Sequence, residues 1–538
     1  MMVQMGTKKS VYHAVNYVWN FFIFFVVSLV LIFSGFFLDF PMFVRASLPF
    51  WFGLCFVWGH AVVALCQMFT AFFSKSKWCT FAMFFVSYFI SDIGEGLMMV
   101  FDSGPHSKHW LTWIPSFGLV KIMRIVRTFT SPDQEGLVFA DLYSSDYAIG
   151  SLLIRIMIGT VCIHIITLYL EVVLTNEFGA HHDWFFFVKP SFYKKIDEHE
   201  ATKNLTPTLT GDADVDNEAQ RAFNEVDNAV RVLNLQHRYP GADEEALKGV
   251  SFCAKRGETI GLCGSNGAGK STLISALSGL FAATGGDAYI NHTSIRDSMA
   301  EIYKILGICP QFDALWNVIT GSDHLRFYAR IKGYPASEIE GIVEEALKMV
   351  KLEGAGKKEA GQYSGGMRRR LSLAIALLGY KNKLSFLDEC TTGVDVSTAA
   401  FIYDAIKSQQ ANKTVLLTSH SFEEINELSD RVIIMKDGRI AAIGTPLELK
   451  RKFGSGYKVS LVVTNEDCLK EVMEKVNARL EEVVVIGQLG VNLQFVCSME
   501  KNKLSEIFEL IQEMKEFIAD SSVGHSSLEE IFFKVISA

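Results

Sequence analysis

The chain has 538 residues, a hydrophobic share of 49% and a formal net charge of -8. This length accommodates about three domains with cores of ordinary size. The acidic balance argues against nucleic acid as the main partner, because a phosphate-binding surface needs a basic stripe. Ten Cys without paired spacing indicate neither a zinc site nor a disulfide framework.

The amino-terminal third is the most apolar part of the chain. Stretches without Asp, Glu, Lys or Arg run from Ser10 to Leu38 and from Ala46 to Ser74, each long enough to cross a bilayer as a helix. Buried helices of a soluble protein are the alternative, which runs of this length disfavour. We predict an α-helical transmembrane domain over residues 1–190, with about four spans. The predicted spans are residues 18–38, 47–73, 78–100 and 152–174.

Basic residues set the predicted orientation of these spans. Lys8 and Lys9 precede the first span, and Lys75 and Lys77 separate the second from the third. The positive-inside rule places both groups, and with them both chain ends, in the cytoplasm. The segment 110–129 contains Pro and three basic residues, so we expect a partly inserted hairpin on the outer side, with a full span as the alternative.

A polar connection follows the membrane region. Residues 195–228 are acidic and lack apolar periodicity, which is typical of a flexible chain. We therefore place a cytoplasmic linker at residues 191–228.

A glycine-rich loop with chemical meaning begins after this linker. The sequence GETIGLCGSNGAGKSTLISALSGL, from Gly257, predicts a short strand, a phosphate-binding loop and a helix. Its glycines allow backbone N–H groups to turn toward phosphate oxygens, while Lys270 reaches the β and γ phosphates and Ser271 holds Mg²⁺. The predicted nucleotide-binding residues of the loop are Gly264, Ser265, Asn266, Gly267, Ala268, Gly269, Lys270, Ser271 and Thr272.

Two acids end a later apolar strand, KLSFLDEC, which we expect to lie beside the first strand in a parallel sheet. Asp388 suits the metal, and Glu389 faces the attacking water as its general base or its orienter. His420 follows another apolar strand, where an imidazole contacts the γ phosphate.

Between these strands, Ser364, Gly365 and Gly366 precede a helix. They form either an anion site or a routine helix cap.

These motifs together resemble a known family. GSNGAGKST, CPQFDALW, YSGGM, FLDEC, TTGVD and His420 are similar, in order and spacing, to the Walker A, Q-loop, signature, Walker B, D-loop and H-loop of ABC ATPases. The resemblance implies an α/β P-loop NTPase domain at residues 229–455 that binds ATP and Mg²⁺. It adds Gln311 as a nucleotide and metal contact, Asp395 as the D-loop acid, and Tyr239 as the aromatic that stacks on adenine. For Tyr239 a plain core position is the alternative.

Longer stretches resemble the A subfamily of ABC transporters, whose members move lipids. They include YSGGMRRRLSLAIALLG, LTSHSFEEINELSDRVIIMKDGRI and VGHSSLEEIFFKV, and the similarity covers nearly the whole chain. Met367 fits the A subfamily. Cys390 and Val396 stand where the family commonly has Pro, which puts the rigidity of both turns in doubt.

The front of the chain departs from the family pattern. A family half transporter has six spans and an outer domain between its first two, whereas this sequence opens with a segment that looks like the coupling helix before the third. We therefore interpret the chain as the carboxyl-terminal part of a half transporter. A truncated gene model, a split subunit and a degenerate copy all fit that interpretation.

Alternating strand and helix patterns predict a small α+β domain at residues 456–538. The resemblance implies the family's regulatory domain, and a plain structural cap is the alternative. The predicted fold class is thus an α-helical transmembrane domain, an α/β P-loop NTPase domain and a small α+β C-terminal regulatory domain.

The expected function is ATP-driven transport by a multi-pass membrane protein whose nucleotide-binding domain is cytoplasmic, with a lipid as cargo. The resemblance implies a partner, either a second half transporter or a nucleotide-binding domain in the same or another chain. The two domains then pair head to tail, so that Ser364 serves the partner's ATP. A truncated or non-catalytic partner of another ABC transporter is the first alternative. A soluble ABC ATPase acting on nucleic acid is the second, which the apolar runs disfavour.

Overall fold

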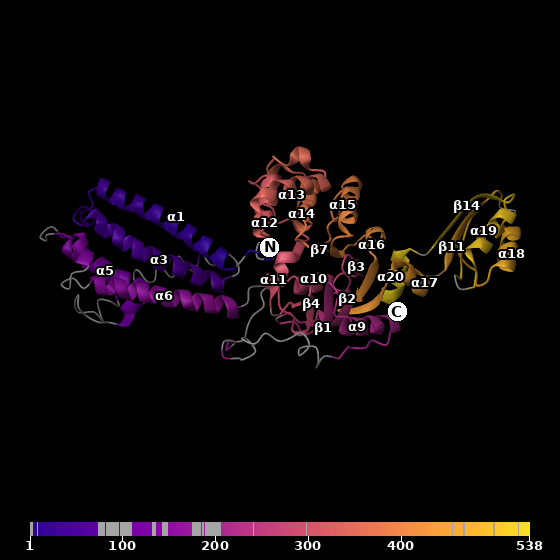
Figure 1. Cartoon of the computed structure of the whole chain (residues 1–538), viewed down its shortest axis with the longest axis horizontal. Coiled ribbons are helices and arrows are strands. Elements are labelled where there is room, and N and C mark those ends of the chain that lie inside the picture. Colours follow the sequence, from indigo (N-terminus) through magenta and orange to yellow (C-terminus); the bar gives the residue numbers. More distant parts are fainter. Residues whose placement is uncertain are drawn as a thin grey trace. The chain divides into compact units, whose positions relative to one another are not determined.

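A computed structural model of the chain describes residues 4–7, 9–73, 81, 96, 110–131, 136–142, 149–174, 184–185, 188, 206–239, 241–296, 298–454, 456–465, 468–498, 501–525 and 527–537. The chain divides into a helical unit, Lys8–Tyr193, and an ATPase unit formed by Met1–Thr7 with Lys194–Ala538 (Figure 1). The first residues were predicted to belong to the transmembrane domain. Instead Met5 is fully buried in the core of the ATPase unit.

Three long helices dominate the described part of the helical unit: α1 (Lys9–Phe37), α3 (Leu48–Phe72) and α6 (Ile149–Val173). By length and composition these three are the candidate membrane spans of the described residues, at Ser10–Phe37, Leu48–Phe72 and Ile149–Glu171. They overlap the predicted spans 18–38, 47–73 and 152–174. The predicted span 78–100 lies almost entirely outside the described residues.

Shorter elements complete the described part of this unit. They are α2 (Pro41–Val44), η1 (Trp110–Trp113), α5 (Pro115–Phe129) and η2 (Phe139–Leu142). The 15 residues of α5 are too few to cross a bilayer, which needs about 20. Pro115 occupies the first turn of α5, where its missing N–H leaves no helix hydrogen bond unmade.

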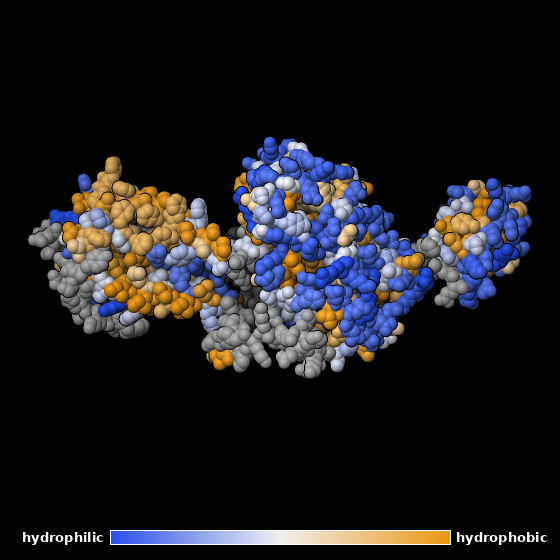
Figure 2. Space-filling model, viewed as in Figure 1, coloured by the Kyte–Doolittle hydropathy of each residue, from blue (hydrophilic) through white to orange (hydrophobic). Residues whose placement is uncertain are grey.

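Apolar side chains cover the outside of the helical unit as well as its core. Phe50 and Ile122 are fully buried, whereas Trp19 on α1 is 60% exposed and Ile165 on α6 is 61% exposed. In Figure 2 the surface of this unit is mostly hydrophobic, whereas that of the ATPase unit is mostly hydrophilic. An exposed apolar surface of this extent indicates a lipid-facing or partner-facing role.

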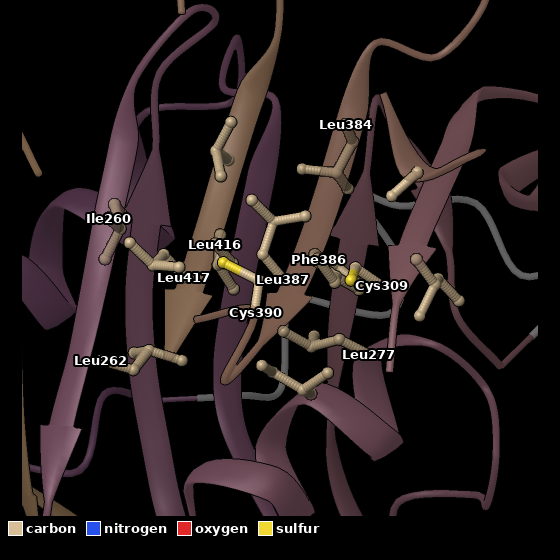
Figure 3. Packing of buried hydrophobic residues seen from close by; sticks show 14 of the residues in the cluster. Ile260, Leu262, Leu277, Cys309, Leu384, Phe386, Leu387, Cys390, Leu416 and Leu417 are labelled. Carbon is tan, nitrogen blue, oxygen red and sulfur yellow. The ribbon is translucent and has the colours of Figure 1, made fainter. Parts of the chain in front are cut away.

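The ATPase unit is built around a six-stranded sheet with the order β10-β9-β3-β8-β7-β6. Its strands pair in parallel except for the hairpin of β9 and β10. The strands are β3 (Thr259–Gly264), β6 (Leu306–Cys309), β7 (Leu384–Asp388), β8 (Thr414–Thr418), β9 (Arg431–Lys436) and β10 (Arg439–Gly444). Buried side chains of β3, β6, β7 and β8 pack together in the hydrophobic core (Figure 3).

This order corrects one prediction. The strand that ends in the two acids, β7, was expected beside the P-loop strand β3, but β8 lies between them. All three strands are short, continuous apolar runs, so hydropathy alone does not distinguish their order in the sheet. The insertion brings the loop that follows β8 to the same edge as the acids.

A smaller antiparallel sheet with the order β2-β1-β4-β5 forms part of the same core. Its strands are β1 (Val230–His237), β2 (Leu247–Ala254), β4 (Gly285–Ile290) and β5 (Thr293–Ser294). The helices of this part are α10 (Lys270–Leu277), α11 (Met299–Ile305), α12 (Gly321–Ile331), α13 (Ala336–Met349), η4 (Glu353–Ala355), η5 (Ala360–Gln362), α14 (Gly365–Ala376), α15 (Val396–Gln409), α16 (Phe422–Leu428) and α17 (Pro446–Phe453).

Part of the predicted linker is an ordered helix, so the prediction of a flexible chain is wrong for this segment. Helix α9 (Ala213–Asn224) begins with a cap in which the Asp212 side chain accepts from two backbone N–H groups. Val215 and Ala219 are buried on one face, and Glu218 makes a 2.8 Å ion pair with Arg431. Hydropathy does not reveal this apolar face, because the face is small and charged residues surround it. One of these charges, Glu218, has its partner Arg431 213 positions away in the sequence.

The carboxyl-terminal segment contains a four-stranded antiparallel sheet with the order β12-β13-β11-β14. Its elements are β11 (Tyr457–Val463), α18 (Leu469–Arg479), β12 (Val484–Leu489), β13 (Asn492–Cys497), α19 (Leu504–Glu513) and β14 (Ile518–His525). They bury a core of their own. The last helix, α20 (Leu528–Ser537), instead places Leu528 and Ile531 in the ATPase core. The predicted range 456–538 therefore contains two structurally separate parts.

Candidate nucleotide site

The predicted phosphate loop joins the end of β3 to the start of α10. Gly267 and Gly269 have φ of 83° and 103°, a backbone conformation that favours glycine. A Cβ at Gly269 would come within 2.8 Å of the Ala246 carbonyl oxygen, so a larger residue does not fit there. This loop therefore has the strand–loop–helix geometry that presents backbone N–H groups to phosphate.

Lys270 lies against this loop. Its Nζ donates to the carbonyl oxygens of Gly264 at 2.7 Å and Ser265 at 3.2 Å, and the side chain is largely buried. Burial lowers the pKa of Lys270, while the neighbouring carboxylates of Glu389 and Asp388 act in the opposite direction. The ammonium group is thus held beside the loop by oxygen acceptors that phosphate oxygens resemble.

Two predicted residues, Gln311 and His420, contact the carboxylate of a third, Glu389. Gln311 Nε2 lies 2.9 Å from Glu389 Oε2, and His420 Nε2 lies 2.9 Å from Glu389 Oε1. The three follow β6, β7 and β8, whose carboxyl ends share one edge of the sheet. Because parallel strands deliver their loops to the same edge, residues from distant segments converge there.

The neighbouring acid, Asp388, ends β7. Its Oδ1 accepts a 2.6 Å hydrogen bond from the Thr418 hydroxyl, and the same hydroxyl oxygen accepts from the Glu389 N–H at 3.0 Å. Burial raises the pKa of Asp388, and the charge of Glu389 acts in the same direction. A buried acid of this kind gains from a nearby cation, which suits a metal ligand.

Glu389 itself has a φ of 50°, which is uncommon for a residue with a Cβ. Such backbone conformations cost free energy and persist where surrounding contacts over-determine them. Glu389 is 6% exposed, so its two side-chain partners and its backbone bonds supply those contacts.

Arg369 holds the turn after β7 and was not identified from the sequence. Its guanidinium donates to the carbonyl oxygens of Asp388, Glu389 and Cys390 at 2.9, 2.8 and 2.8 Å. It also donates to the Pro310 carbonyl at 2.6 Å and pairs with Asp313 at 3.1 Å. The residue is 4% exposed.

These contacts of Arg369, here called the Arg369 clamp, explain how the turn after β7 tolerates Cys390 where the family commonly has Pro. Proline's fixed backbone angle is absent, but the Cys390 carbonyl is held by Arg369 and its side chain is fully buried against β7 and β8 (Figure 3). On the other side, Thr391 donates a 2.6 Å bond to the buried Glu424. The only sequence signal was the RRR run at 368–370, which does not show which Arg is buried.

Tyr239 is placed next to the phosphate-loop helix. Its hydroxyl lies 3.1 Å from the Thr272 hydroxyl, and its ring meets His237 edge-on with centroids 4.8 Å apart. The side chain remains 38% exposed. The ring is thus partly open to solvent.

The remaining predicted residues cap helices. Ser364 caps α14 by accepting from the Met367 N–H at 3.3 Å, and Gly365 and Gly366 form the first helical positions. Asp395 caps α15 and accepts from Thr398, and hydrogen bonds from Ser397 and Thr398 lower the pKa of Asp395. Among the contacts of the described residues, Ser364 and Asp395 bond to neither the phosphate loop nor Glu389.

The ABC transporter family model matches residues 247–392. This range contains the phosphate loop, Gln311 and both acids, whereas Tyr239, Asp395 and His420 lie outside it.

Curated relatives match over more of the chain. "ABC transporter A family member 9" of Arabidopsis thaliana is 32% identical over 99% of this chain and 61% of its own length. "Phospholipid-transporting ATPase ABCA3" of Homo sapiens is 30% identical over 74% of this chain and 24% of its own length. A solved structure, that of an ATP binding subunit of an ABC transporter, is 27% identical and covers 42% of this chain and 93% of its own, with a TM-score of 0.39. The chain thus spans about three fifths of the length of the Arabidopsis relative.

Proposed function

We propose that this chain is an ATP-driven transporter subunit. The support is its match to the ABC transporter family model and its similarity, along 99% of its length, to a member of the ABC transporter A family. It couples ATP hydrolysis to the movement of a substrate across a membrane. The observation that carries this proposal is the convergence of Gln311 and His420 on Glu389 at the sheet edge.

The chain's own residues divide the chemistry of hydrolysis. Lys270, held beside the loop, faces the β and γ phosphates, and Glu389 accepts a proton from the attacking water or orients it. His420, whose Nε2 lies 2.9 Å from Glu389 Oε1, contacts the γ phosphate. Ser271, Gln311 and Asp388 would hold Mg²⁺, which neutralises charge that develops on the phosphate oxygens. Asp388 fits that metal because a nearby cation would stabilise its buried carboxylate.

A second nucleotide-binding domain is part of the proposal. Ser364 and Gly365 are exposed, and Val396 beside Asp395 is 88% exposed. None of these residues bonds within the chain's own phosphate loop among the described contacts. They are therefore available to an ATP bound by a partner domain, as the resemblance to ABC ATPases implies.

For the substrate we propose a lipid. The support is the relative whose name is phospholipid-transporting ATPase, together with three apolar helices long enough to span a membrane. The nucleotide site then lies on the cytoplasmic side, as the basic residues around the spans indicate. The sheet of β11 to β14 is proposed as a regulatory domain.

Linkage between the units is proposed to run through the segment before α1. Met5 is fully buried in the ATPase core, and α1 begins four residues later at Lys9. So short a connection transmits displacement because few residues remain to absorb it.

The test is ATP hydrolysis by the purified full chain in lipid vesicles, with Glu389→Gln as the inactive variant. The proposal expects hydrolysis that requires Glu389, leaves ATP binding intact in the variant and increases with added phospholipid. Equal hydrolysis by both proteins would refute the assignment of the site. ATP binding without hydrolysis in the unaltered chain would favour the non-catalytic partner instead.

A further inference from the structure

A cluster of ionisable side chains lies among the three long apolar helices of the helical unit. Tyr17 of α1 and His60 of α3 are joined by a 2.5 Å contact between the phenol oxygen and Nδ1. The ring of His164, from α6, lies with its centroid 5.3 Å from that of Tyr17. All three side chains are half-buried, and each comes from a different candidate membrane span.

The cluster lies deep within these helices. Tyr17 follows the first residue of α1 by eight positions and His164 precedes the last residue of α6 by nine. At about 1.5 Å per residue, both lie roughly 12 to 14 Å from the helix ends. That depth falls within a hydrocarbon core about 30 Å thick, where ionisable groups are costly and occur at functional sites.

The cluster retains unused hydrogen-bond donors. When the Tyr17 hydroxyl donates to Nδ1 of His60, the Nε2–H of His60 remains a donor. Within the described residues, neither Nε2 of His60 nor either ring nitrogen of His164 has a hydrogen-bond partner. One N–H of each imidazole is therefore available to a ligand that offers hydrogen-bond acceptors.

Neighbouring groups shape the cluster without filling its donor capacity. Phe21 stacks on His60 with centroids 4.4 Å apart, and Phe56 meets the same ring edge-on at 4.8 Å. The nearby carboxylate, Glu171, pairs with His13 at 3.4 Å. Aromatic walls and donors together suit a group that is polar at one end and joined to apolar chains.

We propose that Tyr17, His60 and His164 form a site for the phosphate group of a phospholipid headgroup within the membrane region. The inference rests on the proposed function, because it names the class of transported lipid and the residues that recognise it. The phosphate oxygens accept from the imidazole N–H groups, while the acyl chains contact the exposed apolar faces of α1 and α6.

Binding to the purified full chain in detergent, measured by calorimetry without nucleotide, tests this site. Three probes separate the chemistry: short-chain phosphatidic acid, diacylglycerol with the same chains, and inorganic phosphate. We expect phosphatidic acid to bind at least roughly tenfold more tightly than either of the others, because only it presents both phosphate and chains. Equal binding of diacylglycerol, or of inorganic phosphate, overturns a phospholipid headgroup site.

Variants connect the affinity to these residues. His164→Phe keeps a ring of similar size and should weaken phosphatidic acid binding about tenfold while leaving diacylglycerol unchanged. Tyr17→Phe should weaken it less, because the His60 ring loses its fixed tautomer but keeps its donor. The matched control is Thr167→Val on the same helix, since among the described residues the Thr167 hydroxyl bonds only to the Ile163 carbonyl, at 2.8 Å. Unchanged affinity in His164→Phe refutes the site, and equal unfolding temperatures of the three variants exclude misfolding as the cause.

The same proteins distinguish this inference from the proposed function. ATP hydrolysis that depends on Glu389, with no preference for phosphatidic acid, retains the transporter and removes the headgroup site. Selective binding of phosphatidic acid without ATP hydrolysis retains the headgroup site and removes the ATP-driven transporter.

Discussion

Two of the places in the described structure where polar side chains from distant segments meet are held in different ways. At the edge of β6, β7 and β8, Glu389 accepts from Gln311 and lies 2.9 Å from His420 Nε2, and Arg369 binds the Glu389 carbonyl oxygen. Among α1, α3 and α6, a single hydrogen bond joins half-buried rings. The sheet edge is over-determined by buried contacts, which suits chemistry that needs fixed distances. The helical cluster retains unused donors, which suits recognition of a ligand.

The largest expected effect removes the carboxylate at the sheet edge. Glu389→Gln keeps the size of the side chain but removes its charge and its capacity to accept a proton, so ATP hydrolysis should fall by about 10²–10⁴-fold. Steady-state phosphate release in vesicles measures the loss. Glu427→Gln, which removes the carboxylate of an exposed pair with Lys407 at 2.6 Å, is the matched control and should hydrolyse ATP normally.

The over-determination of the sheet edge is tested directly by its buried cation. Arg369→Met leaves three successive carbonyl oxygens without their donor and Asp313 without its ionic partner. Breaking a buried pair costs about 3–5 kcal/mol of unfolding free energy, and hydrolysis should fall as the turn loosens. Chemical denaturation of the full chain measures the first effect.

Arg330→Met, at an exposed position on α12, supplies the comparison for this variant. If Arg369→Met were as stable as that control, the clamp would contribute nothing and the turn after β7 would have another support.

How far the sequence predicts these two places differs for a physical reason. Gln311, Glu389 and His420 were predicted from local motifs, because each lies in a short pattern that follows its own strand. Their convergence follows from parallel strands, although hydropathy did not reveal that β8 lies between β3 and β7. Arg369 escaped because its role depends on burial, which a run of three arginines does not disclose.

In the helical unit, hydropathy predicts which segments are long enough to span, but not how the helices rotate about their axes. The contact between Tyr17 and His60 depends on that rotation, so it is visible only in the structure. Helix α9 is a related case, since its partner Arg431 is remote in sequence. Long-range polar contacts are the part of the fold that local patterns leave undetermined.

A buried lysine of the ATPase unit, Lys332, makes the unfolding free energy depend on pH. Lys332 Nζ donates to the Tyr303 carbonyl at 2.6 Å and to the Leu306 carbonyl, and burial lowers the pKa of Lys332 to about 7. The unfolded chain holds the proton up to a pKa of about 10.4, so it binds more protons than the folded chain between these values. Unfolding free energy should therefore rise with pH in that window, by about 1.4 kcal/mol per pH unit for one group.

Denaturation of the full chain at pH 7 and pH 9, with Lys332→Met beside it, measures this contribution. The variant should lose most of the increase, because it has no proton to release. Lys304→Met, which removes an exposed lysine paired with Glu301 at 2.6 Å, should retain the increase. Parallel pH curves for the unaltered chain and Lys332→Met would contradict a lowered pKa.

The smallest effect concerns Tyr239, where a stacking role and a plain core role make different predictions. Stacking of a base on an aromatic ring contributes about 1–3 kcal/mol, so Tyr239→Ala should weaken ATP affinity roughly tenfold if the ring faces adenine. Tyr239→Phe loses only the 3.1 Å contact with Thr272 and should bind ATP within about threefold of the unaltered chain. A core residue would reverse this pattern: Tyr239→Ala would lower the unfolding temperature and leave the affinity of the folded protein unchanged. Because Tyr239 is 38% exposed, we expect Tyr239→Ala to change ATP affinity more than the unfolding temperature. The pre-formed site at the sheet edge would then include a contact with the base of the nucleotide.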